Sequence, residues 1–189
     1  SYPKREVGHS GYGRDSSELG RTGSQMRLYH GSYVEVSTPN VMFGRKDVDF
    51  GQGFYLTRLR GQAGKWAKLL AGRKPDRVPV LNVYVLDETA IRNSGFRYKV
   101  FEKYDLEWLY YVVDCRNGGR LQRDYDMVEG GVANDNVIDT VEDFENGVIT
   151  ATQALGQLQF KKVNHQLCIH SQKIINAHLR FLGSEVLSE

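Results

Sequence analysis

Residues 49–57 read DFGQGFYLT, and this stretch says most about the fold and the chemistry of the chain. Two glycines, Gly51 and Gly53, directly precede an aromatic strand candidate at 54–57. Because glycine has no side chain, backbone and rings can approach a flat ligand closely here. Upstream, residues 28–32 read LYHGS, a short apolar run that ends in polar groups. Together the two segments predict a cleft for an aromatic, polar ligand.

The composition is that of an ordinary globular domain. The chain has 189 residues, of which 40% are hydrophobic and 25% are charged. A formal net charge of +2 provides no electrostatic argument for binding nucleic acid or a membrane. The first residues hold no apolar core of a signal peptide, and no apolar run approaches the ~18 residues of a membrane span. We therefore expect a cytoplasmic protein, or one that is delivered into the cytosol of a target cell.

The chain divides into two parts by composition. Residues 1–25 are rich in Gly, Ser, Arg and Glu and hold almost no aliphatic residues. This predicts either a tail without a core or an arm that docks on a partner or on the domain. Residues 26–189 form the predicted domain. Cys115 and Cys168 belong to no CxxC or Cys/His pattern, so we expect no metal site and two reduced thiols, with one disulfide as the alternative.

Local patterns predict a mixture of strands and helices. Strands are expected at 27–30, 33–36, 54–57, 80–86, 126–128 and 166–170, and helices at 62–71, 105–113, 150–158 and 171–182. The predicted inward faces are Ala63, Trp66, Ala67 and Leu70 in one helix, and Leu106, Leu109, Tyr110 and Val113 in the next. Asp105 and Thr150 are expected N-caps. Since a regular βαβ rhythm and the third glycine of a dinucleotide fingerprint are both missing, a Rossmann site is excluded and the fold class is predicted to be α+β with largely antiparallel sheets.

The order of the motifs resembles that of the ADP-ribosyltransferase superfamily, of the poly-ADP-ribose polymerase and diphtheria-toxin class. The resemblance rests on LYHGS at 28–32, DFGQGFYLT at 49–57 and VAND at 132–135. It is closest to a mainly microbial branch and covers about residues 26–182. It implies a split fold of two mostly antiparallel sheets with flanking helices. It also implies a toxin or effector setting, with a host protein such as ubiquitin among the acceptors.

The resemblance further implies that NAD is a co-substrate bound between the sheets. The residues expected to bind it are His30, Gly31, Ser32, Gly51, Gly53, Phe54, Tyr55 and Trp66. In this interpretation His30 hydrogen-bonds the adenosine-side ribose, and Tyr55, also a catalytic candidate, stacks on nicotinamide for about 0.5–1.5 kcal/mol. The alternatives are a core histidine at His30 and a β-bulge with core aromatics around Tyr55. Trp66 either closes a ring sandwich around nicotinamide or belongs to the core.

Gln166 departs from the family pattern. These transferases break a nicotinamide–ribose bond through an oxocarbenium-like transition state, which a glutamate normally stabilises. Gln166 stands at that place, where it can hold a hydroxyl but carries no charge and cannot be a base. The domain is therefore inactive, or slow with Gln166 only positioning, or served by another carboxylate. Asp135 is the first candidate (alternatively an Asx-turn or cap) and Asp49 the second (alternatively a loop charge), with Glu129 or Glu107 as a second member of an Asp–Glu pair.

We therefore expect an NAD-dependent mono-ADP-ribosyltransferase that acts on a macromolecule, with a protein acceptor favoured over nucleic acid. The alternatives are an inactive transferase-like module that binds NAD or a partner, and an NAD glycohydrolase. Arg58 and Arg60 are candidates for contacting phosphate groups. The basic and aromatic stretch at 96–104 either touches a pyrophosphate or an acidic partner, or is a solvated face. An antitoxin or immunity protein is a further candidate partner.

Overall fold

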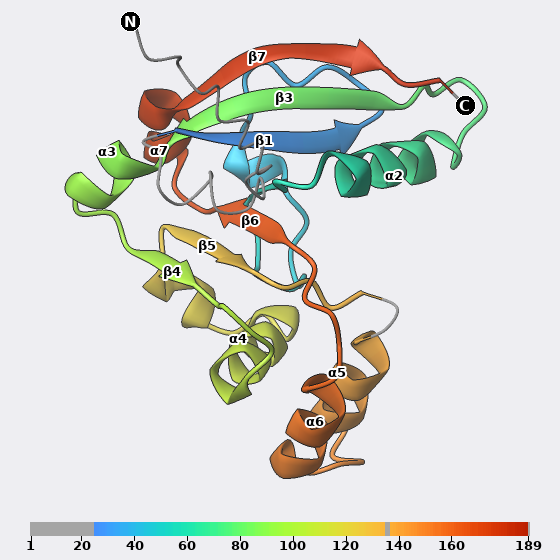
Figure 1. Cartoon of the computed structure of the whole chain (residues 1–189), viewed down its shortest axis with the longest axis vertical. Coiled ribbons are helices and arrows are strands. Elements are labelled where there is room, and N and C mark those ends of the chain that lie inside the picture. The colour runs from blue at the N-terminus through green and yellow to red at the C-terminus, as the bar shows by residue number, and fades with distance from the viewer. Residues whose placement is uncertain (1–24, 135–136, 189) are drawn as a thin grey trace, which may run out of the picture.

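The computed structural model describes residues 25–134 and 137–188. These residues form an α+β fold with two mostly antiparallel sheets, as predicted. Figure 1 shows the two sheets one above the other, with α2 beside the first sheet and α4, α5 and α6 gathered beyond the second. The predicted arm at 1–25 lies outside the described residues, except for Gln25.

The first sheet is antiparallel and has the strand order β1–β3–β7. Its strands are β1 (Gln25–Ser32), β3 (Val80–Asp87) and β7 (Leu179–Val186). The strand with the strongest apolar sequence, β3, takes the central place, where it pairs with β1 along one edge and with β7 along the other. The predicted strand at 33–36 is wrong. The backbone of Val36 bonds two side chains of β3 instead. Its N–H donates to Oδ1 of Asn82 at 2.8 Å, and its carbonyl oxygen accepts from the hydroxyl of Tyr84 at 2.5 Å.

The helix predicted at 171–182 is wrong in its second half. The helix α7 covers only Gln172–His178, and the chain then enters β7 without a loop. Local apolar spacing continues past His178, but pairing with β3 overrides it from Leu179 onward. Strand β7 therefore could not be found from periodicity within its own segment.

The second sheet has the strand order β2–β6–β5–β4. Its strands are β2 (Phe54–Leu56), β6 (Gln166–Ile169), β5 (Met127–Gly130) and β4 (Tyr98–Val100), and only the β4–β5 pair is parallel. An isolated bridge between Tyr29 and Thr57 joins the sheets, with backbone hydrogen bonds of 2.8 and 2.9 Å. Strands β1 and β2 meet at this bridge and diverge on either side of it, each into its own sheet. We call this divergence of β1 and β2 the split.

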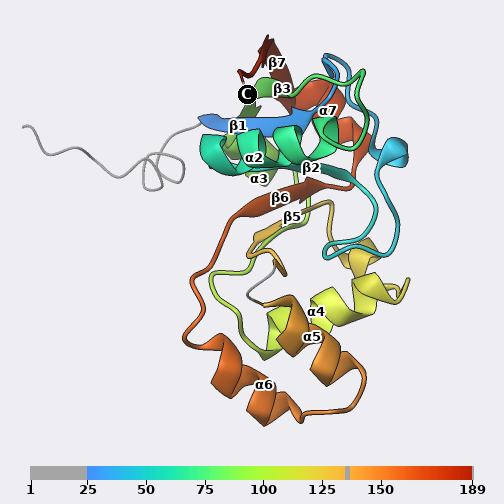
Figure 2. The same ribbon diagram turned by 90° about the vertical axis from the view of Figure 1, so that its right-hand side faces the viewer.

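The helices form two groups. They are α2 (Arg60–Ala71), α3 (Glu88–Asn93), α4 (Leu106–Arg116), α5 (Ile138–Glu145), α6 (Ala151–Leu158) and α7, with 3₁₀ turns at Val41–Phe43 and Leu121–Asp124. Helix α2 packs on β1, whereas α4, α5 and α6 form a layer below β5 and β6 (Figure 2). Both predicted caps are confirmed. Asp105 accepts from the Trp108 amide at 2.9 Å, and Thr150 forms a capping box with Gln153.

Successive residues of the second sheet face different cores. One core lies toward the first sheet and holds Phe54, Leu56, Met127, Leu167 and Ile169, among others. The other lies toward α4 and holds Val128 and Cys168, with Tyr55 packed against it. The predicted faces of two helices need correction: Trp66 of α2 is 41% exposed, and α4 buries Trp108 and Tyr111 while Tyr110 is 51% exposed. In the described part of the chain, no helix combines the length and apolarity that crossing a membrane requires.

Candidate functional site

The carboxylate of Asp49 lies where the loop before β2 meets α4, β6 and the segment after β5. Only 9% of the residue is exposed. Its Oδ2 accepts a hydrogen bond from the amide of Ala133 at 2.8 Å, and its Oδ1 lies 3.3 Å from Nη1 of Arg116. Burial raises the pKa of Asp49, and the Ala133 hydrogen bond and the Arg116 charge act against that rise. Asp49 is therefore a buried, fixed carboxylate and not a solvent-facing loop charge.

Asp49 contacts Gln166, which is also a predicted catalytic residue. The side-chain amide of Gln166, at the first position of β6, donates to Oδ2 of Asp49 at 3.5 Å. Asp135, which the sequence ranks as the first candidate carboxylate, lies outside the described residues, two positions after Ala133. Within the described residues, no group hydrogen-bonds Oε1 of Gln166. That carbonyl oxygen is thus an acceptor which a ligand hydroxyl can use.

Tyr55 holds the backbone of the two residues that follow Asp49. Its hydroxyl donates to the carbonyl oxygen of Gly51 at 2.6 Å and accepts from the amide of Phe50 at 3.1 Å. Burial raises the pKa of this hydroxyl well above its ordinary value. Gly51 has a φ of 79°, in the left-handed region that favours glycine. Tyr55 therefore fastens the turn that immediately follows Asp49.

The predicted convergence of His30 and Tyr55 on one ligand is wrong. Nδ1 of His30 lies 2.7 Å from the backbone carbonyl oxygen of Tyr55, and the imidazole packs on Phe54 at a centroid distance of 4.5 Å. Phe54 and Tyr55 are consecutive in β2, so their side chains lie on opposite faces of the strand. The half-buried His30 accordingly packs against the core between the sheets, whereas the Tyr55 ring faces the α4 side.

Internal packing involves four of the other residues predicted to bind NAD, namely Gly31, Ser32, Gly53 and Phe54. A Cβ at Gly31 would lie 2.1 Å from the carbonyl oxygen of Ala63, so the glycine allows α2 to approach β1. Gly53 lies against Cys168, and Ser32 and Phe54 are each 7% exposed. The Trp66 ring lies 5.7 Å from the guanidinium carbon of Arg73 and has no described contact with His30 or Tyr55. The predicted ring sandwich is therefore not formed in this structure.

A second ionic cluster lies on the opposite face of β5. Glu129 is 2% exposed, and its Oε1 lies 2.8 Å from both Nη2 of Arg58 and Nε2 of His165. The hydroxyl of Tyr98 donates to the other oxygen of Glu129. Burial acts to raise the pKa of Glu129, and the His165 hydrogen bond and the charges around it more than offset this, lowering it to about 2. Glu129 therefore stays ionised and does not reach Asp49. The other candidate, Glu107, is exposed and pairs with Lys99 at 2.6 Å.

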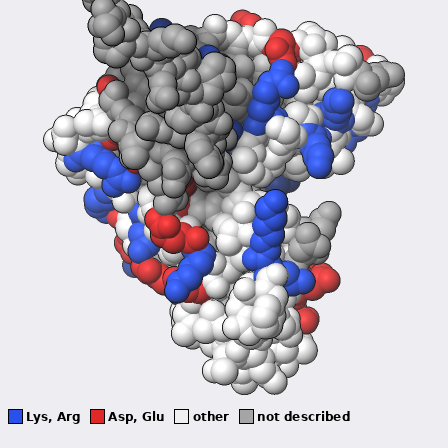
Figure 3. Space-filling model, in the orientation of Figure 1, with Lys and Arg blue, Asp and Glu red and all other residues white. Residues whose placement is uncertain are grey.

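His165 connects this cluster to the split between the sheets. Its Nδ1 accepts from the backbone amide of Arg58 at 3.1 Å, so Nε2 carries the proton and donates to Glu129. The carbonyl oxygen of His165 accepts from Thr57, the residue after β2, at 2.9 Å and from Gln62 of α2 at 2.7 Å. Figure 3 shows the surface hollowed between α2 and the α5–α6 side, with Lys and Arg side chains on both sides of the hollow.

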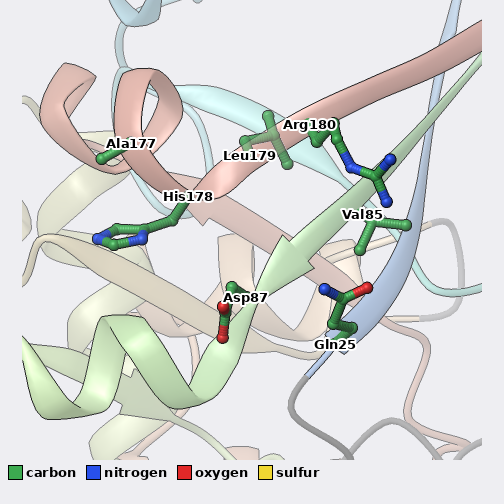
Figure 4. A pocket seen from close by; sticks show the side chains of 7 residues that line it. All are labelled: Gln25, Val85, Asp87, Ala177, His178, Leu179 and Arg180. Atoms are coloured by element: carbon green, nitrogen blue, oxygen red, sulfur yellow. The ribbon is translucent and has the colours of Figure 1, made fainter.

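Two further hollows lie elsewhere on the described part of the chain. One of about 160 Å³ is lined by β1, β3, α7 and β7, and its side chains include Gln25, Asp87 and Arg180 (Figure 4). The other, of about 430 Å³, lies between residues 37–40 and α7. Neither is lined by a residue that the sequence analysis assigned to NAD or catalysis.

Three residues of the site were missed in the sequence. Arg116 lies at the end of α4, where a basic residue is common and signals nothing further. His165 was not singled out from the Asn164–Gln166 stretch. Nε2 of His170 lies 2.7 Å from the carbonyl oxygen of Phe50, and its Nδ1 lies 2.8 Å from that of Gln122. His170 thereby holds the backbone directly before Gly51. These roles depend on distant partners, which local sequence does not contain.

The described residues contain no group of three or more His, Cys, Asp or Glu side chains placed to hold a metal ion. Cys115 and Cys168 are both free and fully buried in the core that faces α4. Each thiol has its pKa raised by burial, to about 12 for Cys115. The disulfide alternative is thus not realised in this structure.

The site therefore belongs to an α+β protein with two sheets split at β1 and β2 and a buried carboxylate–amide pair at the start of β6. Residues 26–181 match a family described as "protein of unknown function (DUF3990)", and the chain belongs to this family. No curated protein and no solved structure matches the chain.

Proposed function

We propose that this chain is an NAD-dependent mono-ADP-ribosyltransferase whose acceptor is a protein side chain. The observation that carries the proposal is the meeting of Asp49 and Gln166, 117 residues apart in sequence, at 3.5 Å. Asp49 begins the DFGQGFYLT motif, and Gln166 stands where the family resemblance places a glutamate. The split between β1 and β2, bridged at Tyr29 and Thr57, supports the proposal because the family resemblance implies a split fold.

The chemistry assigns different tasks to the two side chains. Breaking the nicotinamide–ribose bond leaves positive charge on the ribose, and nicotinamide departs with the bonding electron pair. The Oε1 atom of Gln166 has no hydrogen-bond donor among the described residues, and by accepting from a ribose hydroxyl it would orient the sugar. The Asp49 carboxylate supplies the negative charge that Gln166 lacks, and a fixed charge in a buried site is the strongest kind of electrostatic stabilisation. Asp49 is also the candidate base that takes the acceptor's proton, giving a transferred ADP-ribosyl group, nicotinamide and a proton.

Basic side chains near the split offer contacts for the diphosphate of NAD. The guanidinium of Arg58 is held by Glu129 at 2.8 Å, so it is fixed in position beside the end of β2. Arg60, two residues further, is paired with Glu185 at the surface. The protein acceptor follows from the family resemblance, and a hydroxyl group of ubiquitin is one example. A toxin or effector role, with an antitoxin or immunity protein as a candidate partner, belongs to the same proposal.

A second candidate function is a transferase-like module that binds NAD or a partner without turnover. The specific observation in its favour is that His30 and Tyr55 use their polar groups within the protein. Nδ1 of His30 bonds the carbonyl oxygen of Tyr55 at 2.7 Å, and the Tyr55 hydroxyl bonds that of Gly51 at 2.6 Å. An NAD glycohydrolase, with water as the acceptor, is the third outcome that the same assay detects.

The test is incubation of the full chain with NAD labelled in the adenylate part, with ubiquitin and a set of cytosolic proteins as acceptors. A transferase places label on protein, a glycohydrolase releases ADP-ribose with nicotinamide, and a binding module releases neither. We expect Asp49→Asn to lower nicotinamide release by about 100-fold. Gln166→Ala and Asp135→Ala are measured in parallel, and Glu107→Gln serves as the control because Glu107 pairs only with Lys99 among its described contacts. Wild-type rates in both Asp49→Asn and Gln166→Ala would overturn the assignment.

A further inference from the structure

Arg116 is shared by three carboxylates. Its Nη1 lies 3.3 Å from Asp49, its Nη2 lies 3.6 Å from Glu142, and its Nε lies 3.9 Å from Glu145. None of these distances is that of a close bidentate ion pair, which is ~2.8 Å. The guanidinium is thus held between Asp49 and the α5 helix without being fully committed to either.

This position has an electrostatic consequence for the proposed reaction. A cation 3.3 Å from Asp49 cancels much of the negative charge that an oxocarbenium-like transition state needs. The α5 carboxylates provide an alternative place for the same cation. The side chains of Glu142 and Glu145 are 51% and 23% exposed, whereas that of Asp49 is 12% exposed, so only Asp49 is charged in a largely dry environment.

We propose that Arg116 is an autoinhibitory charge partner of Asp49, and that its transfer to Glu142 and Glu145 of α5 releases the Asp49 carboxylate for catalysis. The proposal rests on the proposed function, since it concerns the same carboxylate. It makes α5 a regulatory element, because any contact that moves this helix changes which carboxylate holds the cation.

The other ionisable groups around Asp49 do not provide a competing cation. Tyr55 on β2, Tyr104 before α4 and Cys115 on α4 are close enough for Asp49 to affect their pKa values, and burial raises the pKa of each. All three are therefore neutral near neutral pH. Among the described residues, Arg116 is the cation paired with Asp49.

The test follows the Asp49 carboxyl resonance of the full chain by NMR across a pH titration, with Asp49→Asn used to assign the signal. We expect Arg116→Gln to raise the Asp49 midpoint by about one pH unit or more. We expect the double variant Glu142→Gln/Glu145→Gln to lower it, because Arg116 then stays on Asp49. Asp139→Asn removes an exposed carboxylate of the same helix and should leave the midpoint unchanged.

Removing two nearby negative charges also acts on Asp49 directly, so the double variant is repeated in the Arg116→Gln background. The proposal requires a clearly larger shift when Arg116 is present. Equal shifts in both backgrounds, or no shift, would overturn it. In the turnover assay, the double variant should lower kcat for NAD about fivefold without changing KM. Absence of NAD turnover in the wild type would refute the proposed function, whereas the titration alone decides whether Arg116 is shared.

Discussion

The imidazole of His30 donates from Nδ1 to the backbone carbonyl oxygen of Tyr55 at 2.7 Å. The contact joins the two motifs that the resemblance emphasises, but it uses the main chain of Tyr55 and not its ring. Burial lowers the pKa of His30 while this hydrogen bond acts in the opposite direction. The two side chains therefore stabilise the edge of the split from opposite faces of β2. In this structure, the position of Asp49 and not an aromatic clamp defines the candidate site.

Tyr55→Phe separates anchoring from stacking. The variant keeps the ring but removes the hydroxyl that bonds Gly51 and Phe50. We expect the free energy of unfolding to fall by about 1–2 kcal/mol, because the amide of Phe50 and the carbonyl of Gly51 lose a partner. Urea denaturation measures this. Tyr110→Phe is the matched control, since Tyr110 is 51% exposed.

The same variant tests the site by calorimetry with NAD. If Tyr55 fastens the turn that carries Asp49, Tyr55→Phe should weaken NAD binding by about tenfold. If the ring itself stacks on nicotinamide, the affinity should stay at the wild-type value. That second result would show that the Tyr55 hydroxyl does not hold a turn on which NAD binding depends.

Gly31→Ala should disrupt the packing of α2 on β1. The new Cβ would lie 2.1 Å from the Ala63 carbonyl oxygen and 2.9 Å from the Ala67 amide, and neither backbone can move without shifting the helix. We expect a loss of about 2–3 kcal/mol in the free energy of unfolding. Gly156→Ala is the control in α6, where a Cβ meets nothing within 4 Å, and it should stabilise the protein by about 0.5–1 kcal/mol. A tolerated Gly31→Ala would show that α2 does not pack this closely on β1.

Glu129 should contribute a pH-dependent part of the stability. Its pKa falls from 4.5 to about 2 on folding, so its contribution is complete above pH 4.5 and is lost as the pH drops through about 2. Glu129→Gln should therefore cost about 3 kcal/mol at pH 7 and clearly less at pH 3. Chemical denaturation at the two pH values measures the difference. An equal cost at both would show that Glu129 is not held ionised by Arg58 and His165.

Gln166→Glu introduces the residue type that the resemblance to ADP-ribosyltransferases implies here, but it places a second carboxylate against Asp49. The amide that it replaces lies 3.5 Å from Asp49 Oδ2, so the two acids cannot both ionise without repulsion. Because the folded protein then holds a proton more tightly than the unfolded chain, the variant should be less stable by about 1–2 kcal/mol at pH 8 and closer to wild type at pH 5. The exposed Gln159→Glu is the control. Equal stability at pH 5 and pH 8 would argue that Gln166 and Asp49 are separated in solution.

The elements with complete local signals were predicted correctly. Strand β3 has an apolar run, α4 has the Asp105 cap, and α6 has the Thr150 capping box, and each signal lies within its own segment. Strand β7 was missed because its pairing with β3 involves residues about 100 positions away. The inward face of α4 was also misjudged, since Leu106 and Tyr110 have the right spacing but the core lies on the side of Trp108.

The candidate site divides in the same way. Motif spacing selected Asp49 and Gln166, and the structure places them in contact. The motif could not show that Gly31 and Gly51 serve internal packing, because the atoms that fill their space come from α2 and Gln122. Nor could it show Arg116, which reaches Asp49 from another helix.

Residue order alone was enough to establish the α+β class, most strands and helices, and the two polar residues at the centre of the site, because periodicity, caps and turn residues act over a few positions. Side-chain direction, by contrast, depended on the assembled molecule. Phe54 and Tyr55 are neighbours in β2, yet Phe54 faces the core between the sheets and Tyr55 faces the core on the α4 side. Only the packing of both sheets with α4 decides that Phe54 contacts His30 and that Tyr55 holds the turn beside Asp49.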